Sequence, residues 1–234
     1  MKKTVKLLVA SIVAISASSA IAEPGKWYIG AGAGLSSYSD WSTSNITDLR
    51  NELGTRLGIV RFEGTQSADA DDSATGYKLF GGYSFHENIA VEFSYINMGQ
   101  VDANSSSSGT FYDAFDNFVV GDLSATASAK VEAITLDVAL NYPITSVAAV
   151  IVKGGIYGAD TKLALDVSSS DFPDKNFTYS NTTGSSGLHY GIGMNFKVTD
   201  AIGIRAEWER LYQVEANSGE SDVDLLSAAL VYNF

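Results

Sequence analysis

The feature that most constrains this chain is a two-residue alternation of large apolar side chains that recurs along almost the whole sequence. Successive side chains of a β-strand point to opposite faces, so an apolar residue at every second position predicts a strand with one apolar face. Eight stretches show this pattern: 27–35, 75–85, 89–97, about 127–142, 148 to about 162, 186–198, 202–214 and 222–234. The alternation therefore predicts an all-β fold of eight strands.

The connections between these stretches alternate in length. Short ones lie at 86–88, 143–147 and 199–201, whereas long ones rich in Ser, Thr, Asn and Asp lie at about 36–74, 98–126, 161–185 and 215–221. In an up-and-down meander every second connection lies at the same end, so all long loops emerge together and all short turns lie opposite. This layout is typical of an antiparallel barrel with short turns on one side of a membrane and long loops on the other.

The faces opposite the apolar ones carry ionised side chains. They are Lys78, Glu92, Asp137, Lys153, Arg205 and Glu207. A cation facing lipid at the bilayer midplane costs roughly 2–4 kcal/mol, so six outward charges would cost on the order of 10 kcal/mol, comparable to the stability of a whole domain. Turned inward, three cations meet three anions, and interior glycines leave room for them. A soluble lipocalin-like barrel would need the reverse arrangement. The pattern predicts an eight-stranded antiparallel up-and-down transmembrane β-barrel.

Residues 1–22 have the pattern of a secretory signal peptide. Lys2, Lys3 and Lys6 precede a short apolar run, and residues 20–22 read Ala-Ile-Ala, which fits a cleavage site. The apolar run is too short for a transmembrane helix. We therefore predict a signal peptide at 1–22 and one barrel domain at 23–234.

The composition excludes several classes of protein. The net charge of −12 argues against nucleic-acid binding. The absence of cysteine rules out a disulfide framework and a cysteine-based zinc site. Nothing in the sequence indicates a cofactor or a metal site.

The final strand, 222–234, ends on Phe234, with Tyr232 and Leu230 at the alternate positions before it. In order and spacing, this strand and the segments 27–32, 153–157 and 204–208 resemble the small OmpA-type and OmpX-like outer-membrane barrels. The resemblance covers the whole of 23–234 and implies the outer membrane of a Gram-negative bacterium. It also implies that Tyr232 and Phe234 form the signal that the barrel-insertion machinery reads. The peptidoglycan-binding domain of full-length OmpA has no counterpart here.

The same resemblance implies a set of partners. We expect contacts with outer-membrane lipid and lipopolysaccharide, and transient contacts with periplasmic chaperones and the insertion machinery. We expect no nucleic-acid partner, and we expect a monomer.

Family resemblance further implies that the inward charges form a salt-bridge network that plugs the lumen and, in some members, acts as a gate. Glu92 is expected to pair with Lys78 or Arg205, and Asp137 with Lys153. Unpaired buried charge is costly, so pairing is expected whether the network is a structural plug or an ion gate.

An enzymatic role is not expected. A lipid A hydrolase resembling PagL would need a His and a Ser two residues apart on a strand, with a carboxylate nearby. His86 is followed by Glu87-Asn88 and His189 by Tyr190-Gly191, so neither forms the motif.

Two functions remain open. One is a structural role in envelope integrity, with narrow or gated passage of ions and small solutes. The alternative is a surface adhesin or ligand-interaction protein that acts through the long loops, where 44–54 is predicted to form a short amphipathic helix. Binding of small apolar ligands in the manner of OmpW would need an apolar lumen, against which the inward charges argue.

Overall fold

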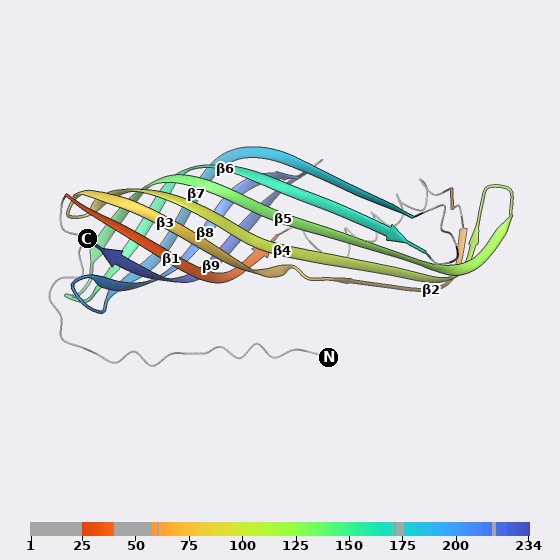
Figure 1. Ribbon diagram of the computed structural model, residues 1–234, viewed down its shortest axis with the longest axis horizontal. Helices are drawn as coiled ribbons and strands as arrows, with labels where there is room; N and C mark the ends of the chain where they lie inside the picture. Colours follow the sequence, from red (N-terminus) through yellow and green to blue (C-terminus); the bar gives the residue numbers. More distant parts are fainter. Residues whose placement is uncertain (1–24, 40–57, 60, 170, 172–175, 217–218) are drawn as a thin grey trace.

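The computed structural model describes residues 25–39, 58–59, 61–169, 171, 176–216 and 219–234, and all regular structure in these ranges is β (Figure 1). The strands are β1 (Lys26–Tyr38), β2 (Arg61–Ala70), β3 (Ser73–His86), β4 (Ile89–Tyr112), β5 (Phe118–Pro143), β6 (Ala148–Ser168), β7 (Phe177–Lys197), β8 (Ile202–Ala216) and β9 (Gly219–Asn233). In this part of the chain, no helix has the length and hydrophobicity to cross a bilayer. The predicted signal peptide (1–22) and loop helix (44–54) lie outside the described residues.

Eight of these strands form a closed antiparallel ring, which confirms the predicted barrel. The order around the ring is β1, β3, β4, β5, β6, β7, β8 and β9, and β9 returns to β1. The closing ladder runs from Tyr28 opposite Asn233 to Tyr38 opposite Val223. The ninth strand, β2, falls within the connection predicted at 36–74 and pairs with the far part of β4, outside the ring.

The apolar faces point away from the lumen, as predicted. Leu79 is 55% exposed whereas its neighbour Lys78 is fully buried, and Leu136 is 51% exposed whereas Asp137 is 1% exposed. Outward aromatic residues gather towards the two ends of the barrel. Trp27 packs on Tyr83 near the short turns, with ring centroids 4.9 Å apart. The result is an apolar belt with aromatic ends, which suits a bilayer and its two interfaces.

The short turns lie where the sequence placed them. β3 and β4 are separated by two residues, β5 and β6 by residues 144–147, and β7 and β8 by residues 198–201. Both ends of the described chain lie at the same end of the barrel, where Phe234 N donates to Trp27 O at 3.0 Å. One end of the molecule is therefore compact.

The other end differs from prediction, because most of the expected loop residues are strands. β4, β5, β6 and β7 continue past the barrel as an extended sheet, with β2 added to β4 (Figure 1). We call this sheet the wing; it consists of β2 and residues 101–112, 118–132, 160–168 and 177–188. Beyond the membrane both faces meet water, so small polar residues replace the apolar alternation and the sequence loses its strand signal.

The β4–β5 hairpin at the tip of the wing has an ordered turn. Asp113 accepts hydrogen bonds from Phe115 N at 2.8 Å, Asn117 N at 3.0 Å and Asn117 Nδ2 at 2.8 Å. The Asn117 side-chain donor, followed by the Phe115 and Asn117 amides, holds the pKa of the Asp113 carboxyl below its usual range. The projecting hairpin thus closes with a defined turn.

Two β-bulges mark the level at which the wing leaves the barrel. In β4 the register shifts between Asn97 and Gln100, where Gly99 has a φ of 75°. In β8 it shifts between Leu211 and Val214, where Gln213 has a φ of 55°. A bulge bends its strand and ends regular pairing. Beyond these points β4 no longer pairs with β3, and β8 no longer pairs with β7.

Candidate functional site

All six predicted lumen residues are buried and lie in one cluster inside the barrel. Lys78, Glu92, Asp137, Lys153, Arg205 and Glu207 are each at most 3% exposed. They come from β3, β4, β5, β6 and β8, so the cluster spans the lumen from wall to wall. Two further ionisable residues, Glu209 and His189, join them and are equally buried. We call these eight residues the lumen network.

Glu92 is one centre of the lumen network. Its carboxylate accepts from Arg205 Nη1 at 2.6 Å, from Lys153 Nζ at 3.1 Å and from the Tyr28 hydroxyl at 3.0 Å. The Arg205 guanidinium also lies 4.6 Å from the centre of the Phe80 ring. The predicted Glu92–Arg205 pair is therefore present, and aromatic rings shield it on the lumen side.

Lys78 and Lys153 share the carboxylates of β8. Lys78 Nζ binds Glu207 and lies 2.7 Å from Glu209 Oε2. Lys153 Nζ binds Glu209 and lies 3.5 Å from Glu207 Oε1. Each lysine thus contacts more than one carboxylate, so the ion pairs form a connected network, in which removal of one member affects several others.

The predicted pairing of Asp137 with Lys153 is wrong. Asp137 Oδ1 instead lies 2.8 Å from His189 Nδ1, and its Oδ2 accepts from the Thr135 hydroxyl at 2.7 Å. Strand register explains the difference, because Asp137 lies opposite Gly155 and Lys153 lies opposite Ala139. Gly155 also lies opposite His189, so the two side chains meet over a residue that has none.

The prediction omitted Glu209 and His189, although the pattern contained both. Glu209 follows Arg205 and Glu207 at two-residue spacing on the same face of one strand, and His189 lies opposite the apolar Leu188 and Tyr190. Extending the inward-facing register to the end of each strand would have found them. With these two, four carboxylates face three permanent cations and one imidazole.

The lumen network lies between two apolar layers. Towards the short turns, Ala90, Ile151 and Val231 belong to a buried cluster with Tyr28 and Phe80. Towards the wing, a larger cluster fills the lumen: Tyr38, Ile96, Met98, Val101, Ala129, Val131, Ala133, Tyr157, Ala159, Leu211, Val214, Val223 and Leu225. Part of the lumen is therefore apolar, contrary to the sequence argument, but packed side chains occupy it.

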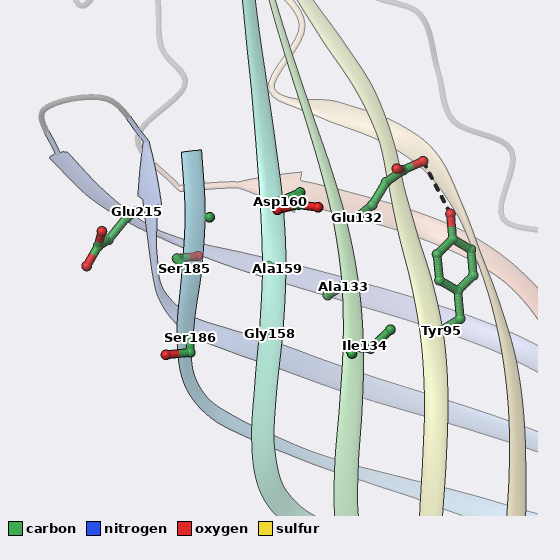
Figure 2. Close-up of a pocket in the computed structure, with 11 residues that line it drawn as sticks. Tyr95, Glu132, Ala133, Ile134, Gly158, Ala159, Asp160, Ser185, Ser186 and Glu215 are labelled. Atoms are coloured by element: carbon green, nitrogen blue, oxygen red, sulfur yellow. Dashed lines mark hydrogen bonds between the residues drawn. The ribbon is translucent and has the colours of Figure 1, made fainter. Parts of the chain in front are cut away.

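A separate pocket opens at the base of the wing (Figure 2). Its volume is about 650 Å³, and residues from β4, β5, β6, β7 and β8 line it. Figure 2 shows Glu215, Asp160 and Glu132 spaced across neighbouring strands, with the Tyr95 hydroxyl donating to Glu132 at 3.2 Å. Among the described residues, no group of His, Asp and Glu side chains is arranged to hold a metal ion. The pocket is thus an acidic recess without metal-ligand geometry.

A closed antiparallel barrel with an apolar exterior, aromatic ends and an ionised, filled interior defines the class of transmembrane β-barrels. The model of the OmpA-like transmembrane domain family matches residues 22–234. The chain belongs to this family and is an outer-membrane β-barrel protein. A comparison with curated protein sequences gives no match.

Solved structures of small outer-membrane barrels are similar to the chain at low identity. OprG from Pseudomonas aeruginosa is 14% identical with a TM-score of 0.50, covering 93% of this chain and 99% of that chain. Ail from Yersinia pestis is 16% identical with a TM-score of 0.48, covering 91% and 100%. Neisserial surface protein A is 13% identical with a TM-score of 0.48, covering 89% and 97%. At these identities the likeness concerns the fold.

Proposed function

We propose that this protein is a non-enzymatic surface-binding protein, in which the barrel is the membrane anchor and the wing is the binding element. The observation that carries the proposal is the continuation of four barrel strands into a single paired sheet beyond the membrane. From Ile134 to Phe118, β5 alone adds sixteen residues, or about 50 Å at roughly 3.3 Å per residue. A paired sheet presents a more rigid surface than flexible loops.

The filled lumen supports this order of roles. Ion pairs and two packed apolar layers occupy the interior, and fully buried side chains include Lys78, Glu92 and Ile151. A resting open channel would require water-exposed lumen walls. The barrel is thus better suited to anchoring than to free diffusion.

Shortening the wing tests the surface-binding role. Cells that express a variant lacking residues 103–126, joined by a short Gly-containing turn, are expected to lose most of their binding to host-cell monolayers. Heat-dependent gel mobility should still report a folded barrel, because the deletion begins beyond the β4 bulge. Unchanged cell binding by a correctly inserted deletion variant would reject the proposal.

A second candidate function is a structural barrel with gated ion passage, which the wall-to-wall lumen network favours. Glu92 contacts Lys153, Arg205 and Tyr28, so its removal would loosen the centre of the plug. In planar bilayers, Glu92→Ala is expected to raise the open probability at least tenfold over the native protein. Glu132→Ala, which alters a carboxylate outside the lumen network, is the matched control. Equal conductance of all three proteins would leave the network as a plug only.

A further inference from the structure

The wing has one strand edge that the described chain leaves unpaired. β7 pairs with β6 along its whole length, from Phe177 opposite Val167 to Phe196 opposite Ala148. Its pairing with β8, in contrast, covers only residues 189–197. Between Phe177 and Leu188, no described strand pairs with β7 on the β8 side. We call this stretch the β7 edge.

The separation of β8 from β7 is built into the sequence rather than caused by fraying. Pairing stops at Leu211, immediately before the β8 bulge. The Tyr157 hydroxyl donates to Tyr212 O at 3.0 Å, and Gln213 N donates to Asp222 Oδ1 at 3.0 Å. Side chains thus satisfy backbone groups of the bulge, which lets β8 turn towards β9 without losing those hydrogen bonds.

Backbone parity identifies the residues that face the open side. Lys197 N donates to Val147 O at the start of β6, and Val198 N donates to Ile202 O on β8. Amides alternate in direction along a strand, and the β6–β7 register runs without a shift. Even-numbered residues therefore direct their N–H and C=O groups to the open side: Thr178, Ser180, Thr182, Gly184, Ser186 and Leu188.

The β7 edge lacks the features that usually prevent strand addition. Natural edge strands are protected by charged side chains, proline or bulges. Residues 177–188 contain no charged residue and no proline, whereas the strand at the opposite margin of the wing, β2, carries Arg61, Glu63 and Asp69. One margin of the wing is thus guarded and the other is open.

The acidic pocket lies against this open edge. Gly184, Ser185 and Ser186 of β7 line it, together with Asp160 from β6 and Glu215 from β8 (Figure 2). Glu132 of the same pocket binds Lys130 at 2.8 Å, but no ion pair within the described residues involves Asp160 or Glu215. A cation that enters the pocket would meet two unpaired carboxylates beside the free backbone groups.

We propose that the β7 edge binds an extended basic segment of another polypeptide, which adds as a strand and places a Lys or Arg side chain in the acidic pocket. Backbone hydrogen bonds supply the affinity in this mode of recognition, and a side-chain pocket supplies specificity. The proposal rests on the surface-binding function above and names the chemistry of its partner. A second copy of this chain fits less well, because the protein carries a net charge of −12 and would bring like carboxylates together.

Proline substitution on the free edge tests the proposal. Thr182→Pro removes a donor that faces the open side and leaves the β6 ladder intact; Thr182→Val is the matched control. The probe is a fluorescent twelve-residue peptide of alternating Lys and Thr, with a Glu-Thr peptide as the charge control, and the full-length protein is held in lipid nanodiscs. Thr182→Pro is expected to weaken binding of the Lys-Thr peptide at least tenfold, whereas Thr182→Val binds as the native protein does.

A second variant tests the pocket independently. Asp160→Asn combined with Glu215→Gln is expected to weaken the Lys-Thr peptide at least tenfold and to reduce the salt dependence of its binding. Equal binding by native and Thr182→Pro proteins, equal binding of both peptides, or edge-dependent self-association in place of peptide binding would overturn the proposal. If peptide binding fails while deletion of 103–126 still abolishes cell binding, the surface-binding function stands and the edge proposal falls.

Discussion

Replacing Lys153 with methionine is expected to lower the free energy of unfolding by about 3–5 kcal/mol, the usual cost of removing one partner from a buried ion pair. Methionine keeps a similar shape but leaves Glu92, Glu207 and Glu209 without the cation that they share. Urea titration of the protein folded into lipid vesicles, followed by heat-dependent gel mobility, measures the change.

The pH dependence of this variant has a definite sign. With a cation removed, crowded carboxylates favour their protonated form in the folded state more than in the unfolded chain. The folded state then binds more protons, so the stability deficit is expected to shrink as the pH is lowered. Lys162→Met, at an exposed position on the same strand, is the control and should change stability by less than about 0.5 kcal/mol. Equal stability of the two variants would show that the lumen network contributes little to folding.

Side-chain direction in the barrel could be predicted from the sequence because period-two alternation has only two phases. Once lipid was assigned to the apolar phase, Lys78 and Arg205 had to face the lumen, and both are buried there. The identity of each ion partner could not be predicted in the same way. Partners depend on the stagger between strands, which the pattern within one strand does not contain. Glu92–Arg205 was correct, whereas Asp137 pairs with His189.

The wing was missed for a physical reason rather than for lack of strands. Residues 98–126 are rich in Ser, Thr, Asn and Asp, which usually indicate loops. A sheet with water on both faces has no buried side, so its sequence need not alternate. The pairing of Ser106 with both Ser67 and Ser124 shows that small polar residues on three strands form this sheet. The free β7 edge and its pocket follow from the wing and were equally invisible.

Substitution of Gly155 by alanine is the second change with a large expected effect. A Cβ at this position would lie 2.0 Å from Leu136 O and 2.6 Å from Asp137 Oδ1, so the neighbouring strand would have to move. Such a shift also separates Asp137 from His189, which meet over this glycine. We expect a loss of about 3 kcal/mol, at the upper end of the range for overpacked sites, and a lower yield of folded barrel.

Gly154 provides the matched control, because it is the adjacent glycine on the opposite face of the same strand. A Cβ there would meet only His189 O at 3.9 Å, so Gly154→Ala should leave stability unchanged or raise it slightly. Urea titration in vesicles compares the two variants directly. If both alanine variants match the native protein, close approach at Gly155 does not determine how the lumen network packs. If only Gly155→Ala unfolds early, the missing side chain is what lets Asp137 and His189 join across a strand.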